Sequence, residues 1–292
     1  MMRMIALCFA LLGMVAAVPA FAWGGFGHDT TAEIAEANVS PRARAKIAGL
    51  IAADRSLGTP ECRIHNLGDA ANWPDCVRRT RWRWGYTAAW HYRTAPICEA
   101  YNPRGRCSGG NCVTAQIERS HRILADESLP VHLRLEALAF MVHFAGDVHM
   151  PLHSGDKSDR GGNDRRADYG IVPNMNLHWI WDGPLAERAI TSGARPIVRR
   201  YSAAERGDLS GGTPADWGRE SWQIARDVIY PLAFDTDPCA GELPKVTKLT
   251  QDDITAMVPI ARRRVQQAGI RIADLLESAF APGPLLIEES RR

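Results

Sequence analysis

Two histidine–aspartate pairs with the same spacing are the residues of this sequence best suited to chemistry. His143 precedes Asp147 by four positions, and His178 precedes Asp182 by the same interval. On a helix this spacing directs both side chains to one face, and Zn²⁺ binds imidazole nitrogen and carboxylate oxygen at about 2.0–2.2 Å. One such pair alone is more often a structural hydrogen bond or salt bridge. Two pairs, joined by a Gly-rich segment that contains His153, favour a metal site.

The first residues of the chain have the pattern of an export signal. Arg3 is followed by an uncharged apolar run, Met4–Val18, and then by a small-x-small signature that ends at Ala22. Cleavage after Ala22 would leave a free amine on Trp23, five residues before His28. This amine and the carbonyl oxygen of the same residue can form a five-membered chelate with a metal, which a nearby imidazole can complete. The sequence therefore predicts a metal site that forms only after export.

Charge and composition place limits on the function. The 292 residues include 35 basic and 33 acidic side chains, a formal net charge of +2, which loss of Arg3 with the signal would lower by one. Because the chain is nearly neutral, any polyanion must bind locally. After the signal, no apolar run approaches the roughly 20 residues that span a membrane. We expect an exported, soluble protein in which residues 1–22 are removed and residues 23–292 form one domain, with no obligate protein partner implied.

The cysteines agree with export. Six follow the signal: Cys62, Cys76, Cys98, Cys107, Cys112 and Cys239. An even number in an exported chain indicates disulfides, although six cysteines allow about 15 pairings. Cys107 and Cys112 bracket a short flexible segment, and Cys62 with Cys76 is the next most local choice, which leaves Cys98 with Cys239. The alternative is a cysteine zinc site, which the absence of a CxxC motif disfavours.

Helical patterns dominate the chain. Helices are predicted over Thr31–Val39, Pro41–Ala53, Pro130–Val148, Leu177–Ile190, Ala215–Leu232 and Gln251–Phe280. Strand signals are scarce: Arg81–Arg93 could be extended, and Asp168–Val172 could form a short hairpin. The segment Ser154–Gly170 has the composition of a long loop, a feature that is usually functional within a compact domain. The sequence predicts an all-α class, a single mainly helical domain with a short β-hairpin.

A series of motifs in fixed order resembles the type I, zinc-dependent single-strand nucleases. This 3′-nucleotidase/nuclease family is the sister of the zinc phospholipases C, and the resemblance implies their fold. The match extends from Trp23 to Asp182, with a looser helical similarity beyond. Its motifs are Trp-x4-His at Trp23, Asn-Trp-Pro-Asp ending at Asp75, Trp-His-Tyr around His91, Val-His-Phe-x2-Asp-x3-Pro-Leu-His ending at His153, Gly-Gly-Asn ending at Asn163, and Asn-Leu-His-x3-Asp ending at Asp182.

The resemblance implies three zinc ions at the bottom of a cleft. The implied ligands are Asp75, His91, His143 and Asp147 for the first ion; Trp23, His28 and the bridging Asp147 for the second; and His153, His178 and Asp182 for the third, more open ion. Asp75 would also orient the attacking water. Arg78, where the family has a cleft arginine, would bind phosphoryl oxygens through its fork of donors. The catalytic residues implied are therefore Asp75, Arg78 and Asp147.

Substrate contacts follow from the same resemblance. Tyr92 lies where the family stacks a nucleobase, and Asn163 would hydrogen-bond the base edge. Arg160 belongs to a locally basic loop, with Lys157, Arg165 and Arg166, that could bind the phosphate backbone. A structural tyrosine, a turn asparagine and a solvated charge run are the alternatives. Thr94 departs from fungal members, which carry an acid at this position.

We expect a secreted or periplasmic endonuclease with three zinc ions. It would cleave RNA and single-stranded DNA to 5′-phosphate products and act on 3′-nucleotides. A phospholipase C on the same scaffold is one alternative, but those enzymes have glutamate at the position of Asp182 and a longer gap after the terminal Trp. The other is a zinc-binding export protein without catalysis, which would need neither Arg78 nor an open third ion site.

Overall fold

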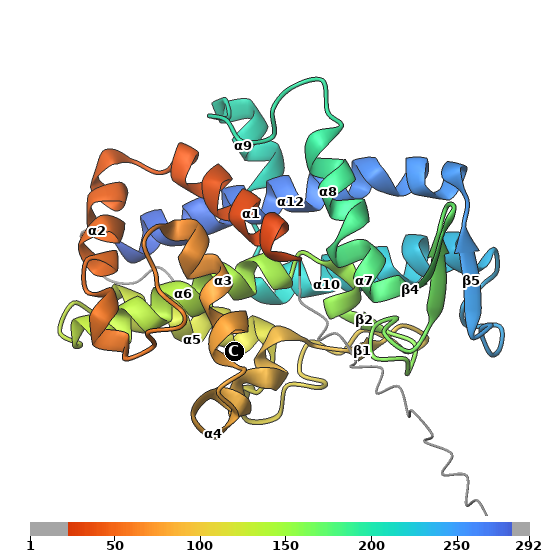
Figure 1. Ribbon diagram of the computed structural model, residues 1–292, viewed down its shortest axis with the longest axis horizontal. Helices are drawn as coiled ribbons and strands as arrows, with labels where there is room; N and C mark the ends of the chain where they lie inside the picture. Colours follow the sequence, from red (N-terminus) through yellow and green to blue (C-terminus); the bar gives the residue numbers. More distant parts are fainter. Residues whose placement is uncertain (1–22, 282–292) are drawn as a thin grey trace, which may run out of the picture.

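A long C-terminal helix and the helices packed along it organise the fold (Figure 1). The computed structural model describes residues 23–281, so the predicted signal in residues 1–22 lies outside the described residues. The α-helices are α1 (Gly25–Asn38), α2 (Pro41–Ile51), α3 (Leu67–Val77), α4 (Arg81–Trp84), α5 (Val113–Ala125), α6 (Val131–Asp147), α7 (Leu177–Asp182), α8 (Pro184–Thr191), α9 (Ala203–Leu209), α10 (Pro214–Ile224), α11 (Tyr230–Phe234) and α12 (Gln251–Ala279). This is the mainly helical domain that the sequence predicts.

Short elements connect these helices. The 3₁₀ segments are η1 (Asp54–Leu57), η2 (Gly85–His91), η3 (Ser108–Gly110) and η4 (Pro151–His153), and a π-helical turn, η5 (Ala225–Ile229), joins α10 to α11. The strands are β1 (Ala95–Pro96), β2 (Gly155–Asp156), β3 (Arg166–Tyr169), β4 (Val172–Asn176) and β5 (Val246–Leu249). β1 pairs with β2 in parallel, and β4, β3 and β5 form a three-stranded sheet in that order.

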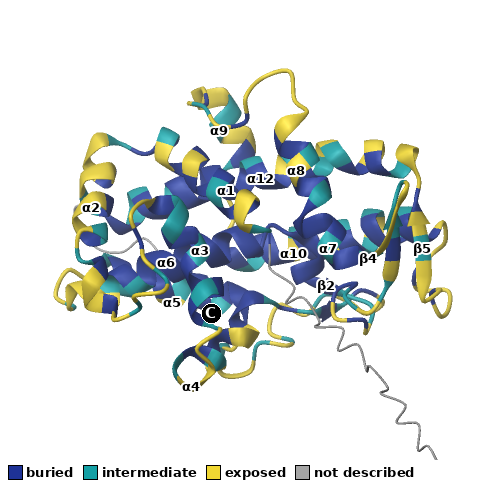
Figure 2. Cartoon of the chain, in the orientation of Figure 1, coloured by how far each residue is buried: buried dark blue, intermediate teal, exposed yellow. Residues whose placement is uncertain are grey.

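Twelve of the 17 residues of helix α6 are buried, and they lie towards its C-terminal end (Figure 2). It packs against α3, α5 and α12, while α12 also packs against α1 and α8. Two hydrophobic clusters meet at the end of α6: Phe144 and Val148 belong to the first, and Met150 and Leu152 belong to the second. Buried apolar surface from both clusters therefore fixes the position of the α6 C-terminus, where Asp147 lies.

The strongest helical patterns were predicted to within about two residues. The helices predicted over 41–53, 130–148 and 251–280 are confirmed as α2, α6 and α12. Thr250 and Asp253 form a capping box at the start of α12, which satisfies backbone amides that the first helical turn leaves unpaired. The helix predicted from Thr31 begins earlier, because α1 starts at Gly25.

Four predictions need correction. The segment 81–93 is not extended: Trp84, Thr87 and His91 bury one face at helical spacing, which gives α4 and η2. The helix predicted over 177–190 breaks at Gly183, because Pro184 begins α8. The helix predicted over 215–232 contains η5 rather than continuous α-helix. The segment 154–170 is not all loop, since both β2 and β3 lie within it.

The predicted hairpin is confirmed and is longer than expected. β3 and β4 are antiparallel, with Ala167 opposite Met175 and an irregularity before Tyr169. The sequence pattern did not indicate β5, which runs parallel to β3 and comes from a segment far along the chain. Residues 23–281 contain no helix that is long and apolar enough to cross a membrane.

Three disulfides join the predicted cysteine pairs within the described residues. Their Cα–Cα distances are 5.8 Å for Cys62–Cys76, 5.3 Å for Cys98–Cys239 and 5.0 Å for Cys107–Cys112. The second bond links positions 141 residues apart. It ties the chain just after β1 to the segment between α11 and β5.

The contact between α1 and α12 depends on Gly269. A Cβ atom at this position would lie 2.4 Å from Cγ2 of Ile34 and 3.1 Å from the carbonyl oxygen of Thr31. We expect Gly269→Ala to lower the free energy of unfolding by about 1–3 kcal/mol, since α1 must shift to accept the methyl group. Gly49→Ala in α2 is the matched control, because no atom lies within 4 Å of its Cβ position. The control should be neutral or more stable by up to about 1 kcal/mol. Urea denaturation of both variants measures the difference, and equal stability would contradict this account.

Candidate metal centre

All the side-chain ligands predicted from the sequence converge on one buried region. They are His28 on α1, Asp75 on α3, His91 at the end of η2, His143 and Asp147 on α6, His153 at the end of η4, and His178 and Asp182 on α7. Their ligand atoms form three groups, and within each group the atoms lie within 4.8 Å of one another. These groups can each hold a cation.

Two of the groups share His143, and Asp147, grouped with His28 and His143, also contacts His91 of the other. Its Oδ2 is 3.0 Å from Nδ1 of His91 and 3.1 Å from Nε2 of His143, whereas its Oδ1 faces Nε2 of His28 at 3.4 Å. Oδ1 of Asp75 closes the first set at 3.8 Å from His91. Because the two carboxylate oxygens face different imidazoles, Asp147 has the geometry of a bridging ligand.

The third group consists of the residues predicted for it. Nε2 of His178 lies 3.1 Å from Oδ2 of Asp182, one helical turn further along α7. The rings of His153 and His178 are stacked, with their centroids 5.0 Å apart. Asn176 is the N-cap of this short helix, because its side-chain oxygen accepts a hydrogen bond from the amide of Trp179. The cap makes α7 begin at Leu177, immediately before His178.

Three imidazoles are oriented by backbone carbonyls. Nδ1 of His143 contacts the carbonyl oxygen of Ala71 at 2.6 Å, and Nδ1 of His153 contacts that of His91 at 2.9 Å. Nδ1 of His178 contacts the carbonyl of Gly161 at 2.8 Å. With a proton on Nδ1, each ring presents the lone pair of Nε2 to the centre. This is the arrangement found around metal-binding histidines in proteins.

Gly161, the first glycine of the Gly-Gly-Asn motif, has no room for a side chain. Gly161 has a φ of 63°, and a Cβ atom there would lie 2.1 Å from the carbonyl oxygen of Leu152. Any side chain would therefore displace the turn that supplies the carbonyl to His178.

Many of the buried atoms that lack hydrogen-bond partners are of the kinds that bind cations. Within residues 23–281, more than half of these atoms belong to the predicted ligands: both ring nitrogens of His28, Oδ1 of Asp75, Nε2 of His91, Oδ1 of Asp147, Nε2 of His153, Nε2 of His178 and both oxygens of Asp182. Each unsatisfied buried group costs about 1–3 kcal/mol. A cation would satisfy imidazole lone pairs and carboxylates together, and this mixed nitrogen and oxygen set suits Zn²⁺. The residues present therefore fit a metal centre.

Burial and neighbouring charges act on the carboxylates in opposite directions. Burial raises the pKa of Asp147, but His143 and the other imidazoles outweigh it and hold the pKa well below its ordinary value. Burial raises the pKa of Asp182 to about 6, against the opposing effect of His178. Burial also lowers the pKa of His28 and His153. At His143 and His178 burial also acts to lower the pKa, but the neighbouring carboxylates outweigh it and raise the pKa. Because a metal binds neutral imidazole, binding at these two rings would displace protons.

Trp23 is fully buried beside the centre. Its indole Nε1 donates to the carbonyl of Gly146 at 2.9 Å, next to Asp147. The amide of Gly24 donates to the carbonyl of Asp182 at 2.7 Å. The backbone of Trp23 is therefore held between the two ligand helices α6 and α7. Chelation by its amine and carbonyl stays a prediction.

Arg78 lies at the edge of the centre, as its predicted role requires. Its Nη2 is 3.1 Å from Oδ1 of Asp75, and it also interacts with Tyr92. Burial would lower the pKa of Arg78, but Asp75 and Tyr92 outweigh burial and raise it, so the side chain stays charged. The ring of Tyr92 is 4.8 Å from that of His153. Both residues therefore adjoin the metal ligands.

The other two predicted substrate residues are engaged in their own turn. Nδ2 of Asn163 donates to the carbonyl of Arg160 at 2.9 Å. Arg160 is 75% exposed, and its Nη1 lies 3.4 Å from Oδ1 of Asp164. The turn adjoins the centre through Gly161, but contact of either side chain with substrate stays a prediction.

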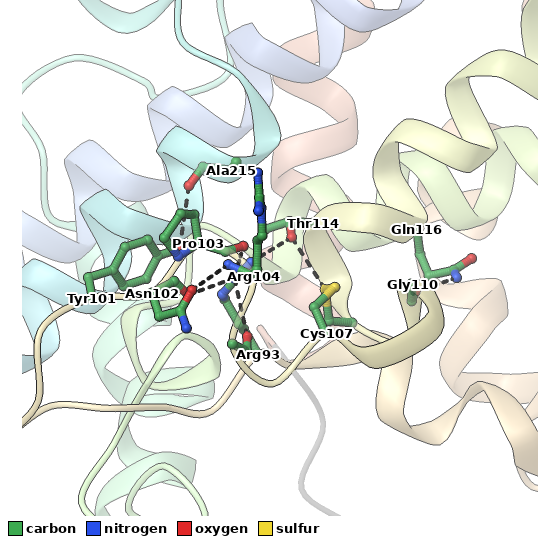
Figure 3. The surroundings of a disulfide bond; sticks show 12 residues. Arg93, Tyr101, Asn102, Pro103, Arg104, Cys107, Gly110, Thr114, Gln116 and Ala215 are labelled. Carbon is green, nitrogen blue, oxygen red and sulfur yellow. Dashed lines mark hydrogen bonds between the residues drawn. A yellow bond between two sulfur atoms is a disulfide. The ribbon is translucent and has the colours of Figure 1, made fainter. Parts of the chain in front are cut away.

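A buried arginine that the sequence pattern did not indicate lies near the Cys107–Cys112 disulfide (Figure 3). Arg93 is 1% exposed, and its Nη1 donates to Oγ1 of Thr114 at 2.9 Å. Its Nη2 donates to the carbonyls of Asn102 at 3.1 Å, Gly105 at 3.2 Å and Pro103. Nothing in the spacing of the sequence marks a buried cation whose partners are carbonyls, so no signal could have found it.

The backbone around Arg93 holds two ligands and Tyr92. The amide of Arg93 donates to the carbonyl of His153 at 2.8 Å, and Nδ1 of His153 contacts the carbonyl of His91. The amide of Val113 donates to the carbonyl of Tyr92 at 3.0 Å. The Cys107–Cys112 disulfide lies directly before Val113, at the start of α5. This network fixes the relative position of the first and third ligand groups.

A second buried arginine holds the chain just after Asp147. Nε of Arg264 donates to the carbonyl of His149 at 3.1 Å, and its Nη2 donates to Oγ of Ser221 at 2.7 Å. Ser221 in turn donates to the carbonyl of Val148. Burial lowers the pKa of Arg264 to about 10, which leaves it charged beside Glu220 at neutral pH.

Loss of Arg93 should destabilise the protein. Arg93→Ala leaves several buried carbonyls without a donor, and hydrogen bonds to charged groups contribute about 1.5–3 kcal/mol each. We expect the free energy of unfolding to fall by about 3 kcal/mol in chemical denaturation. Arg104→Ala is the control, because Arg104 is an exposed residue of the same loop and its removal should change stability by less than about 0.5 kcal/mol. Similar values for the two variants would show that the Arg93 network does not support the fold.

Comparison with known proteins places this centre among enzymes. Endonuclease 4 of Arabidopsis thaliana is 27% identical over 288 residues and covers 91% of each chain. Nuclease S1 of Aspergillus oryzae is 24% identical and covers 88% of this chain and 91% of its own. Among solved structures, the alpha toxin from Clostridium absonum has 11% identity and a TM-score of 0.49, covering 88% of this chain and 65% of the toxin. Similarity at that level supports no conclusion about this chain.

The family model described as S1/P1 Nuclease matches residues 23–281. This match includes every predicted ligand, from Trp23 to Asp182, together with the helices that position them. It also sets aside the alternative of an export protein without catalysis. The chain therefore belongs to the S1/P1 nuclease family, and it is a hydrolase that acts on phosphodiester bonds.

Proposed function

We propose that this nuclease works with three zinc ions and cleaves RNA and single-stranded DNA to 5′-phosphate products, with 3′-nucleotidase activity. The ligands would be those predicted above, with Trp23 contributing its amine and carbonyl. The observation that carries the proposal is the position of Asp147, whose two oxygens face separate sets of buried imidazoles.

Zinc ions bound here would lower the pKa of an attacking water towards neutrality and offset the negative charge of the phosphodiester. The protein would fix the positions of the zinc ligands and of the groups that contact the water and the phosphodiester. Asp147 sets the separation of the first two ligand groups, because its carboxylate is rigidly held on the buried end of α6. Oδ1 of Asp75 lies 3.1 Å from Nη2 of Arg78 at the edge of the centre, where this carboxylate would orient the attacking water.

Arg78 would bind the phosphoryl oxygens. Its guanidinium is held 3.1 Å from Asp75 and stays charged, so it can stabilise the additional negative charge of the transition state. A phosphoryl group bound at this point lies next to both Asp75 and Tyr92. Arg78 therefore positions the reacting group as well as neutralising it.

Tyr92 would select unpaired bases. Its ring is half-buried between His153 and Arg78, so a base must leave the stack of a duplex to reach it. Stacking on an aromatic ring is worth about 1–3 kcal/mol per base and tolerates every base. Arg160 and Asn163, on the turn beside His178, would contact the backbone and the base edge. This arrangement supports a preference for single strands.

The disulfides support an extracytoplasmic location. Disulfides persist in secreted and periplasmic proteins and are rare in the cytosol. Three form within the described residues, one of them across 141 positions. We therefore propose that the protein acts after export, with cleavage between Ala22 and Trp23.

Replacement of the bridging carboxylate tests the metal mechanism. Replacing a residue that only hydrogen-bonds a metal ligand lowers metal affinity or activity by about 10–100-fold. Because Asp147 would bind the metal directly, Asp147→Asn should lower turnover of single-stranded DNA by more than about 100-fold. Elemental analysis of the wild-type protein should give about three zinc per chain, and a chelator should abolish activity. Asp252→Asn, an exposed change in the first turn of α12, is the control and should leave turnover unchanged.

The same assays decide between substrates. Oligonucleotides of RNA and DNA, duplex DNA, 3′-nucleotides and phosphatidylcholine vesicles are compared at equal enzyme concentration. Full turnover by Asp147→Asn would refute the bridging role. Cleavage of the vesicles in preference to nucleic acid would instead favour the phospholipase C alternative.

Extension of the N-terminus tests the role of Trp23. A chain that begins with Met before Trp23 lacks the free amine at the predicted position, so we expect it to lose about one zinc equivalent and most of its activity. The control carries a tag after Arg292 and begins at Trp23. Equal zinc content and equal rates in the two proteins would count against a terminal chelate.

A further inference from the structure

The segment that follows Asp75 concentrates positive charge that the ligand scheme does not use. Between Asp75 and Glu99 the sequence contains five arginines and no acidic residue, although the whole chain is close to neutral. Arg83 has a structural role, because its Nη2 donates to the carbonyl of Leu57 at 3.0 Å and its guanidinium lies over Trp84. Arg93 is buried and also has a structural role. Of the other three, Arg79 and Arg81 are exposed and Arg78 is half-buried beside Asp75.

A hollow of about 610 Å³ lies beside these arginines and is lined by Arg78, Arg79, Arg81, Gly85 and Ala88. α4 and η2 are consecutive, and positions 81, 85 and 88 recur at helical spacing, so one face of this helical run forms a wall. The run ends at His91. Arg78 both lines the hollow and contacts Asp75, so the hollow begins at the metal centre.

Two exposed aromatic rings stand next to this wall. Trp82 is 86% exposed and Tyr86 is 59% exposed, and they are one helical turn apart. Tyr86 packs edge-on against Trp90, with ring centroids 5.2 Å apart, which holds it in place. Exposed aromatic rings beside cationic side chains are the elements with which proteins bind single strands: rings stack on bases and cations contact phosphates.

In the basic loop around residue 160, carboxylates neutralise the charge of two arginines. There Nε of Arg165 is 2.9 Å from Asp159, and Arg160 pairs with Asp164. Arg81, in contrast, is exposed and makes no ion pair within residues 23–281. The positive charge of Arg81 is therefore less neutralised by carboxylates than the charge of that loop, and it is more available to an anionic strand.

We propose that Arg79, Arg81, Trp82 and Tyr86 form a binding platform for single-stranded nucleic acid beyond the cleaved bond. The proposal rests on the proposed nuclease function. The strand passes from Arg78 into the hollow, where Arg79 and Arg81 contact its phosphates. A base one or more nucleotides from the cleavage site stacks on Trp82. The platform thus gives the enzyme a preference for long strands over dinucleotides.

Kinetics on two substrate lengths test this proposal with the zinc-loaded full chain. For wild type, Arg81→Glu and Trp82→Ala, kcat/KM is measured on a 20-nucleotide single strand and on a dinucleotide. We expect the ratio of the two values to fall about tenfold in each variant, because the dinucleotide does not reach the platform. The slope of log kcat/KM against log salt for the long strand should become shallower by about 0.7 in a variant that lacks one phosphate contact.

Three matched variants separate the platform from general effects. Trp82→Phe keeps a ring and should retain most of the ratio. Arg42→Ala removes an exposed arginine of α2, and Ile171→Ala removes an apolar side chain that is 99% exposed at the hairpin tip; both should behave as wild type.

The outcomes are distinct. An unchanged ratio in Arg81→Glu and Trp82→Ala, with wild type cleaving both substrates, overturns the platform and leaves the nuclease function intact. An equal fall in the Arg42→Ala control also overturns it, since net charge alone would then explain the effect. A wild-type chain that cleaves neither substrate overturns both proposals.

Discussion

The crowding of imidazole and carboxylate around Asp147 is the constraint on which the rest of the structure depends. These groups are buried, many lack hydrogen-bond partners, and the three carboxylates belong to one small region. Without a cation, such a region is costly, because buried polar groups lose water and gain nothing in return. The protein must therefore supply rigidity from elsewhere. A surrounding core of two hydrophobic clusters and the long helix α12 provides it.

Support comes from both sides of the ligand groups. Arg93 donates hydrogen bonds to carbonyls of the loop that precedes α5 in the sequence. Arg264 donates to a carbonyl of the segment that follows α6. Both are buried cations whose partners are mostly neutral, an arrangement that satisfies many acceptors with one side chain. The ligand histidines are in turn oriented by the carbonyls of Ala71, His91 and Gly161. The geometry of the candidate metal centre is thus set by backbone positions far apart in sequence.

The sequence indicated the histidines and aspartates that converge in the structure far better than it indicated the residues that support them. His143 with Asp147 and His178 with Asp182 are recognisable because helical spacing brings each pair together, and the local cysteine pairs left one choice for the third disulfide. Helices with long apolar stripes were equally clear. The segment 81–93 misled because its aromatic residues suit a strand as well as a helix. Arg93 and β5 depend on contacts between distant segments, which a single sequence does not encode in its spacing.

The Cys98–Cys239 bond has a consequence for maturation. Two of the disulfides close short loops, but this one joins cysteines 141 residues apart and encloses the Cys107–Cys112 pair. A chain whose cysteines were oxidised strictly in sequence order would join Cys98 to Cys107 and leave Cys112 for Cys239. From that pairing, the native disulfides are reached by thiol–disulfide exchange, which takes seconds to hours and is accelerated by isomerases. Oxidation that follows folding avoids this exchange, because the fold already places Cys98 beside Cys239, with a Cα–Cα distance of 5.3 Å.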